Sequence, residues 1–161
     1  RPHILSMFEH ELDHAFWSLL FGGRIKKLHV SRDDGMVWLT KTNFIITLAP
    51  YFFPLFTFIV VAVSYFVDES YILWAFFMIG FTLAFHMLTS AESLRVKQSD
   101  ITKTGVVFSI PFIFIANLFV LILVMKFISP SNISISRFLE TSWRYTHALF
   151  DLLIMQIKSR N

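Results

Sequence analysis

The residues with the clearest chemistry lie in one short run near the start of the chain, His10-Glu11-Leu12-Asp13-His14. If this run is helical, the two histidines lie one turn apart on the same face, so both imidazoles can reach a single zinc ion. Glu11 is rotated by about 100° from His10 and can act on a water molecule without binding the metal. In this pattern zinc activates the water, and the glutamate takes its proton during attack on a carbonyl. The run therefore predicts a zinc-dependent hydrolase with His10 and His14 as ligands and Glu11 as general base.

A catalytic zinc needs a third protein ligand while one position stays open for water. The sequence offers His3, His86 and Asp100. His3 shares a helix face with His10, but one straight helix cannot easily supply three ligands to one tetrahedron. His86 lies in a long apolar stretch, where hydrogen bonding between helices or proton relay is the alternative. Asp100 lies just before another apolar stretch, where capping of a helix is the alternative, so position alone leaves the third ligand open.

The elements that carry these residues are those of a membrane protein. Of the 161 residues, 55% are hydrophobic and only 16% are charged, whereas about a quarter are charged in a typical soluble domain. Three stretches contain no Asp, Glu, Lys or Arg and are at least as long as the roughly 20 residues that a membrane-spanning helix needs. They do not alternate apolar and polar residues, as the strands of a membrane barrel would. The predicted class is an all-α polytopic membrane protein, a bundle of about four membrane-embedded helices: residues 3–21 with the HExxH run, then spans at 43–67, 71–90 and 104–127.

Two further elements complete the predicted organisation. Residues 24–41 alternate around an Asp34-Gly35 turn signal, which predicts a small β-hairpin after the HExxH helix. Residues 129–161 begin with a Ser/Asn-rich linker and continue as a tail that mixes large apolar and charged residues, as a C-terminal amphipathic helix would. We therefore divide the chain into a membrane core, 1–128, and a linker with an amphipathic tail, 129–161.

Charge and composition limit the partners. Segment 24–41 holds five Lys/Arg and segment 92–103 holds three, so the positive-inside rule puts both on the cytoplasmic side, and the basic tail then falls on the side that the rule does not favour. The net charge of +3 is small and spread along the chain, so we expect no nucleic-acid partner.

The absence of cysteine excludes disulfides and Cys-ligated metals. Because the sequence begins at Arg1 and not at methionine, we allow for a preceding segment; no signal peptide is recognised.

The segment HELDHAFWSLLFGG, followed by a basic stretch and then by LAPYFFPL, resembles the site-2 protease family of intramembrane zinc metalloproteases, in particular its small, minimal-core bacterial members. In that family the third ligand is an aspartate near the start of a later span, and the match here is Asp100 in QSDITKTG. The resemblance implies Zn²⁺ held by His10, His14 and Asp100, with Glu11 as base. The chain departs from the family in lacking its Asn-Pro-Asp-Gly or Leu-Asp-Gly form, and Asp13 occupies a position often filled by a small residue.

The same resemblance implies proteolysis of membrane protein or peptide substrates by a multi-pass protein of the bacterial cytoplasmic membrane, in contact with the lipid bilayer. The alternative is an inactive pseudoprotease that binds membrane partners through the same bundle. A histidine-box di-iron oxidase is excluded, because the chain lacks the several His clusters that such sites require. The oligomeric state is not predicted.

Several other polar residues have possible roles near the site. Asp13, His86 and Asn117 are candidates for orienting a ligand or substrate, although ordinary hydrogen bonding between helices is the simpler expectation for Asn117 and also for Asn43. Three prolines inside the spans, Pro50, Pro54 and Pro111, are expected to kink their helices. The hairpin offers an edge to which an unwound substrate can add as a strand.

Overall fold

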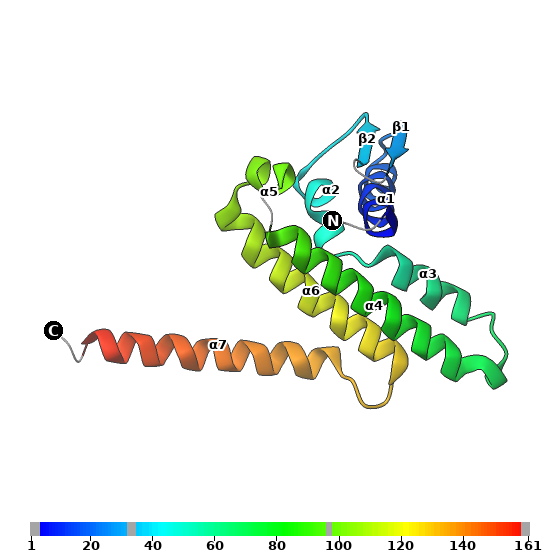
Figure 1. Ribbon diagram of the computed structural model, residues 1–161. Helices are drawn as coiled ribbons and strands as arrows, with labels where there is room; N and C mark the ends of the chain where they lie inside the picture. The colour runs from blue at the N-terminus through cyan, green and yellow to red at the C-terminus, as the bar shows by residue number, and fades with distance from the viewer. Residues whose placement is uncertain (1–3, 32–34, 96–97, 159–161) are drawn as a thin grey trace. The chain divides into compact units, whose positions relative to one another are not determined.

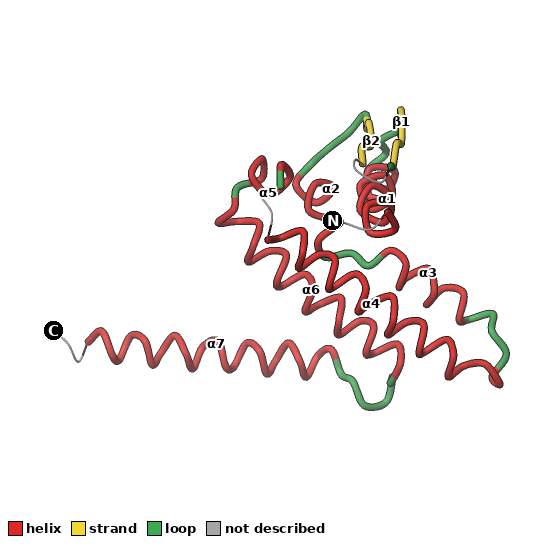
Figure 2. Tube along the Cα trace, in the orientation of Figure 1, coloured by secondary structure: helices red, strands yellow, loops and turns green. Residues whose placement is uncertain are grey.

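A computed structural model describes residues 4–31, 35–95 and 98–158 and is mostly helical (Figure 1). The chain forms two compact units, residues 1–118 and 119–161. In the part of the chain that the structure describes, the strands form one antiparallel hairpin, and loops join the helices (Figure 2). In chain order the elements are α1 (Ile4–Leu20), β1 (Ile25–Val30), β2 (Gly35–Leu39), α2 (Phe44–Leu48), the 3-10 turn η1 (Ala49–Tyr51), α3 (Leu55–Ser64), the 3-10 turn η2 (Glu69–Tyr71), α4 (Ile72–Arg95), α5 (Ser99–Thr104), α6 (Val106–Ile128) and α7 (Ile135–Lys158).

Helix α1 ends where the Gly22-Gly23 pair predicts. Gly22 has a φ of 72°, which L side chains rarely adopt, and the N–H groups of Gly22 and Gly23 donate to the carbonyls of Leu19 (2.9 Å) and Ser18 (2.7 Å). The residues that α1 buries are mostly polar: Glu9, Glu11, Asp13, Ala15 and Ser18. The helix therefore turns its carboxylates into the protein, as expected for an element that builds a site.

The predicted hairpin follows α1, with Leu28 opposite Val37 and Val30 opposite Gly35. Residues 32–34, and with them Asp34 of the predicted turn, lie outside the described residues. Strand β2 packs against α1. A Cβ atom on Gly35 would lie 3.0 Å from Oε1 of Glu11, so the absence of a side chain allows this close approach.

The span predicted at 43–67 is not one straight helix. It is divided into α2, η1 and α3, and the segments Phe44–Tyr51 and Leu55–Ser64 are bent by 76° relative to each other. Pro54 directly precedes α3, and Pro50 lies at the start of η1, so two of the expected proline kinks account for the break. The break places η1 in the centre of unit 1, where the buried apolar cluster is Leu48, Ala49, Tyr51, Phe52, Ile101 and Ile113.

Among the described residues, two helical segments are long and apolar enough to cross a membrane, Glu69–Arg95 and Val106–Ile128, or three if the bent pair is one span. The predicted spans at 71–90 and 104–127 correspond to the first two. The prediction of about four embedded helices is not confirmed in its count: α1, with 17 residues and three carboxylates, is not among the candidate spans. Pro111 lies inside α6 without ending it, while Gly105, with a φ of 94°, separates α6 from α5.

In the second unit, α7 is a helix of 24 residues with no buried side chain. It lies where the sequence predicts the C-terminal amphipathic helix.

Candidate metal centre

Three of the predicted ligands, His10, His14 and Asp100, lie close together in unit 1. Nε2 of His10 and Nε2 of His14 each lie 3.5 Å from Oδ2 of Asp100. One ligand atom from each residue can be chosen so that all three lie within 4.8 Å of one another. Among the described residues this is the one group of three or more such side chains close enough to hold a metal ion. His3 lies outside the described residues.

The donor set and its spacing fit zinc. Two imidazoles and one carboxylate are ligands that catalytic zinc sites use, with a fourth position left open. Ligand atoms about 2.0–2.1 Å from zinc and at a tetrahedral angle are about 3.4 Å apart, close to both 3.5 Å separations. The residues present therefore fit a catalytic zinc site of the His₂Asp type.

The imidazole of His14 is oriented by a backbone carbonyl. Nδ1 of His14 lies 2.8 Å from the carbonyl oxygen of Ile46, the second residue after the start of α2. Because a carbonyl only accepts, Nδ1 carries the proton in the neutral form of His14, the form that binds metal, and the lone pair of Nε2 then faces Asp100; in the protonated form Nε2 donates to Asp100 instead. A lone pair and a carboxylate oxygen that face each other favour a cation between them. This is the arrangement in which a second hydrogen bond fixes the tautomer of a metal-binding histidine.

Asp100 reaches the histidines from the first turn of α5. The N-cap of α5 is Gln98, and Asp100 directs its carboxylate to His10, His14 and Tyr51, so the capping alternative does not describe its contacts. Burial raises the pKa of the Asp100 carboxyl, but the hydrogen bonds and positive charge of the two histidines outweigh burial and hold this pKa below its ordinary value. The Asp100 carboxyl is therefore ionised over the physiological pH range.

Glu11 is buried beside the ligands, with 8% of its surface exposed. It lines two cavities, one of about 930 Å³ shared with His10, His14 and Asp100, and one of about 240 Å³ shared with His10 and His86. A carboxylate in this position can act on a water molecule at the metal without being one of the three ligands.

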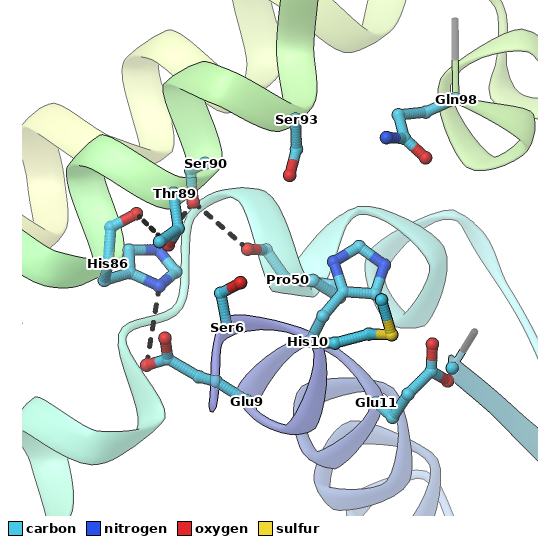
Figure 3. A pocket seen from close by; sticks show the side chains of 12 residues that line it. Ser6, Glu9, His10, Glu11, Pro50, His86, Thr89, Ser90, Ser93 and Gln98 are labelled. Carbon is cyan, nitrogen blue, oxygen red and sulfur yellow. Dashed lines mark hydrogen bonds and ion pairs between the residues drawn. The ribbon is translucent and has the colours of Figure 1, made fainter. Parts of the chain in front are cut away.

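His86 lies away from the metal group. Its Nδ1 is 3.6 Å from Oε1 of Glu9, and its Nε2 is 3.4 Å from the hydroxyl of Ser90 (Figure 3). Both His86 and Glu9 are almost fully buried, at 1% and 2% exposure. Ser90 also donates to the carbonyl of Pro50, which ties α4 to η1. His86 therefore connects α4 to α1 at the edge of the smaller cavity, and it is Asp100, not His86, that lies close to both His10 and His14.

The remaining predicted residues have structural contacts. Asn117 donates to the carbonyl oxygen of Tyr51 in η1 (2.8 Å), which is the expected hydrogen bond between elements, and to that of Ile113 within its own helix α6 (2.9 Å). Asn43 is the N-cap of α2 and accepts from the N–H of Ile46, a local role that we did not predict for it. Asp13 is fully buried, and neither of its oxygens has a hydrogen-bond partner among the described residues, so no contact supports its expected role in orienting a ligand.

Tyr51 is the residue near the site that sequence reasoning missed. Its hydroxyl donates to Oδ2 of Asp100 at 3.3 Å, and its ring meets the His10 ring edge-on with centroids 5.4 Å apart. Tyr51 lies in LAPYFFPL, between Pro50 and Pro54. A polar tyrosine next to prolines that interrupt a predicted span is the feature of the sequence that could have pointed to it.

Apolar helices long enough to cross a membrane, together with a half-buried His₂Asp group beside the buried carboxylate of Glu11, are the features of an integral membrane metallopeptidase. The model of the Peptidase M50B-like family matches residues 2–96, more than half of the chain, and the chain belongs to this family of site-2 proteases. The matched range includes His10, Glu11 and His14 and ends before Asp100, so the place of Asp100 rests on geometry. No match was found among curated proteins or among solved structures.

Proposed function

We propose that this protein is a membrane-embedded zinc metalloprotease that hydrolyses peptide bonds of membrane-associated proteins or peptides. The observation that carries the proposal is the convergence of His10, His14 and Asp100 next to the buried carboxylate of Glu11. A zinc ion held by these three side chains would activate a water molecule and polarise the carbonyl of the bond to be cut.

The chain's own residues supply the proton transfers and the orientation. Glu11 takes a proton from the attacking water and returns it to the leaving amine, so one carboxylate acts first as base and then as acid. The carbonyl of Ile46 keeps the imidazole of His14 in the tautomer that binds metal. Asp100 adds one negative charge to two neutral imidazoles, which leaves the loaded site with net positive charge to attract the electron-rich carbonyl oxygen.

The larger cavity supports an extended polypeptide as substrate. It is bounded by β2, α2 and α5, and the metal group lies along its wall. Gly35, Met36, Val37 and Leu39 of β2 line it, so a substrate strand that pairs with β2 would run past Glu11. Proline substitutions along β2 are expected to lower cleavage while zinc binding is retained; unchanged cleavage would argue against pairing with this strand.

Two apolar helical segments long enough to span the bilayer support an integral membrane location. We further propose a multi-pass arrangement in the bacterial cytoplasmic membrane, with the basic hairpin segment on the cytoplasmic side by the positive-inside rule.

The function is tested with the full chain in lipid vesicles, supplied with zinc and an unstructured, fluorescently labelled protein. The wild type should release peptides, and in ¹⁸O-water the new carboxyl ends should carry the label.

The variant Glu11→Gln should still bind zinc, but its cleavage rate should fall by about 100-fold or more, because the general base is removed. Glu69→Gln, which changes an exposed glutamate, is the control and should cleave like the wild type. Equal cleavage by Glu11→Gln and the wild type would refute this mechanism. A chain that holds no stoichiometric zinc would favour the inactive scaffold instead.

A further inference from the structure

Tyr51 is a buried polar residue that the proposed mechanism does not use. It has no exposed surface, and its hydroxyl lies 3.3 Å from Oδ2 of Asp100, the oxygen that faces both histidines. A tyrosine hydroxyl that is buried needs a hydrogen-bond partner, and the carboxylate provides a charged one. The contact joins η1 to α5, two elements that come from different parts of the chain.

The backbone around Tyr51 is fixed on several sides. Its carbonyl oxygen accepts a hydrogen bond of 2.8 Å from Asn117 of α6, and its ring packs edge-on against His10. Pro50, inside η1, and Pro54, which precedes α3, restrict the backbone on both sides of Tyr51 as well. The phenol is therefore a rigid donor, whereas Asp100 lies on a helix of only six residues.

We propose that Tyr51 is a positioning residue for the metal site: its hydroxyl holds the Asp100 carboxylate in the place where it completes the set of His10 and His14. Hydrogen-bond partners of metal ligands typically contribute about 10–100-fold to metal affinity. The inference rests on the proposed zinc site, and it assigns the orientation of the third ligand to one hydroxyl group.

The test is zinc affinity, measured by competition with a chelating dye on the purified full chain. Tyr51→Phe keeps the ring and removes only the hydroxyl, so we expect affinity to fall about 10–100-fold with the fold unchanged. Tyr71→Phe, which removes the hydroxyl of an exposed tyrosine, is the matched control and should bind like the wild type. Cobalt in place of zinc adds a second readout, because its visible spectrum reports ligand geometry and should change in Tyr51→Phe.

A double-mutant cycle separates positioning from a general effect on packing. In an Asp100→Asn background, Tyr51→Phe should lower affinity no further, because the ligand that it positions is already altered. Wild-type affinity and an unchanged cobalt spectrum in Tyr51→Phe would overturn this inference while the zinc site stands. A wild-type chain that binds no zinc would overturn the proposed function itself, and this inference with it.

A second inference comes from α7 alone. At 100° per residue, Arg137, Glu140, Arg144, Asp151 and Lys158 fall within an arc of about 60° on one face of the helix. Large apolar side chains occupy the opposite face, and no side chain of α7 is buried. The large apolar residues closest to the centre of this face are Ile135, Phe138, Leu139, Leu149, Leu153 and Ile157.

The chemistry of this face favours a lipid surface over a second copy of the helix. The apolar arc covers about 200°, far wider than the narrow seam of a coiled coil. Trp143 and Tyr145 lie at its two borders, where rings with an apolar body and a polar tip suit the membrane–water interface. The connection 129–134 between α6 and α7 is six residues long, so α7 begins within roughly 25 Å of the end of a membrane span.

We infer that α7 lies in the plane of the membrane interface with its apolar face in the acyl region. Because the chain has no cysteine, single spin labels can be placed cleanly in the full protein in phosphatidylethanolamine/phosphatidylglycerol vesicles. Labels at Leu149→Cys and Leu153→Cys should collide with oxygen more than with a water-soluble nickel complex, and labels at Glu140→Cys and Asp151→Cys should show the reverse. Equal water access on both faces, or dipolar broadening between copies at Leu153→Cys, would overturn the inference.

Discussion

The side-chain oxygen of Asn43 accepts a hydrogen bond of 2.9 Å from the N–H of Ile46, whose carbonyl oxygen in turn lies 2.8 Å from Nδ1 of His14. One N-cap thus fixes the turn of backbone that orients the imidazole of His14. The chemistry of the site depends on this short local structure as well as on the ligands themselves.

Removal of the cap should weaken the metal site. Asn43→Ala is expected to destabilise α2 by about 1 kcal/mol, because the N–H of Ile46 loses its partner, and to lower zinc affinity through His14. Asn43→Ser should restore both, since serine caps about as well as asparagine. Zinc titration of the two variants checks this. Equal affinities for Asn43→Ala and the wild type would show that α2 does not need its cap to hold His14.

Substitution of Asp100 and substitution of His86 should have different effects on zinc binding. Asp100→Ala is expected to lower zinc affinity by more than the about 10–100-fold that loss of a ligand's hydrogen-bond partner costs, because a proposed ligand itself is lost. His86→Ala should keep one zinc per chain but destabilise the fold by about 1–3 kcal/mol, because buried Glu9 loses one of the two partners that its carboxylate has among the described residues and keeps only the N–H of Phe56. Zinc content and thermal unfolding of the two purified variants separate these outcomes. Loss of zinc in His86→Ala with retention in Asp100→Ala would reverse the assignment.

At acidic pH the two histidines should become protonated and release the zinc ion. The lowered pKa of Asp100 keeps its carboxylate ionised as the pH falls from about 7.5 to about 5. An imidazole binds zinc only when neutral, and its ordinary pKa is about 6.5. We therefore expect zinc affinity to fall with pH, with a slope that approaches two protons per ion below about pH 6. Equilibrium dialysis at a series of pH values measures the slope, and an affinity independent of pH would contradict histidine ligation.

A methyl group on Gly35 should disturb Glu11 without touching the ligands. The added Cβ would lie 3.0 Å from Oε1 of Glu11 and 2.8 Å from Cγ of Met7, so these side chains must move. We expect Gly35→Ala to cleave roughly 10-fold more slowly than the wild type with zinc affinity retained, because a small displacement of a catalytic group lowers rate. Gly80→Ala is the control, since its added Cβ meets nothing within 4 Å. Wild-type cleavage by Gly35→Ala would mean that Glu11 tolerates the shift.

Local patterns in the sequence predict much of this fold. The HELDH run, the Gly22-Gly23 stop and the alternation of residues 24–41 depend on neighbours a few positions apart, and α1 and the hairpin lie where they predict. The apolar stretches likewise predict α4 and α6, because length and composition decide them.

Contacts between distant segments could not be predicted in the same way. The expected kinks at Pro50 and Pro54 give no bend angle, and the 76° break that buries Tyr51 depends on packing around η1. The partner of His86 is Glu9, on the helix of the metal ligands, and no spacing rule joins them. Asp100 was favoured through family resemblance, and only the fold brings it to His10.

The central claim is that His10, His14 and Asp100 together bind one zinc ion, and an experimental structure of the zinc-loaded chain with anomalous data at the zinc edge tests it most directly. We predict one anomalous peak within about 2.0–2.2 Å of Nε2 of both histidines and of a carboxylate oxygen of Asp100. An anomalous peak elsewhere, or Asp100 turned away from an ion held by the two imidazoles, would contradict the account.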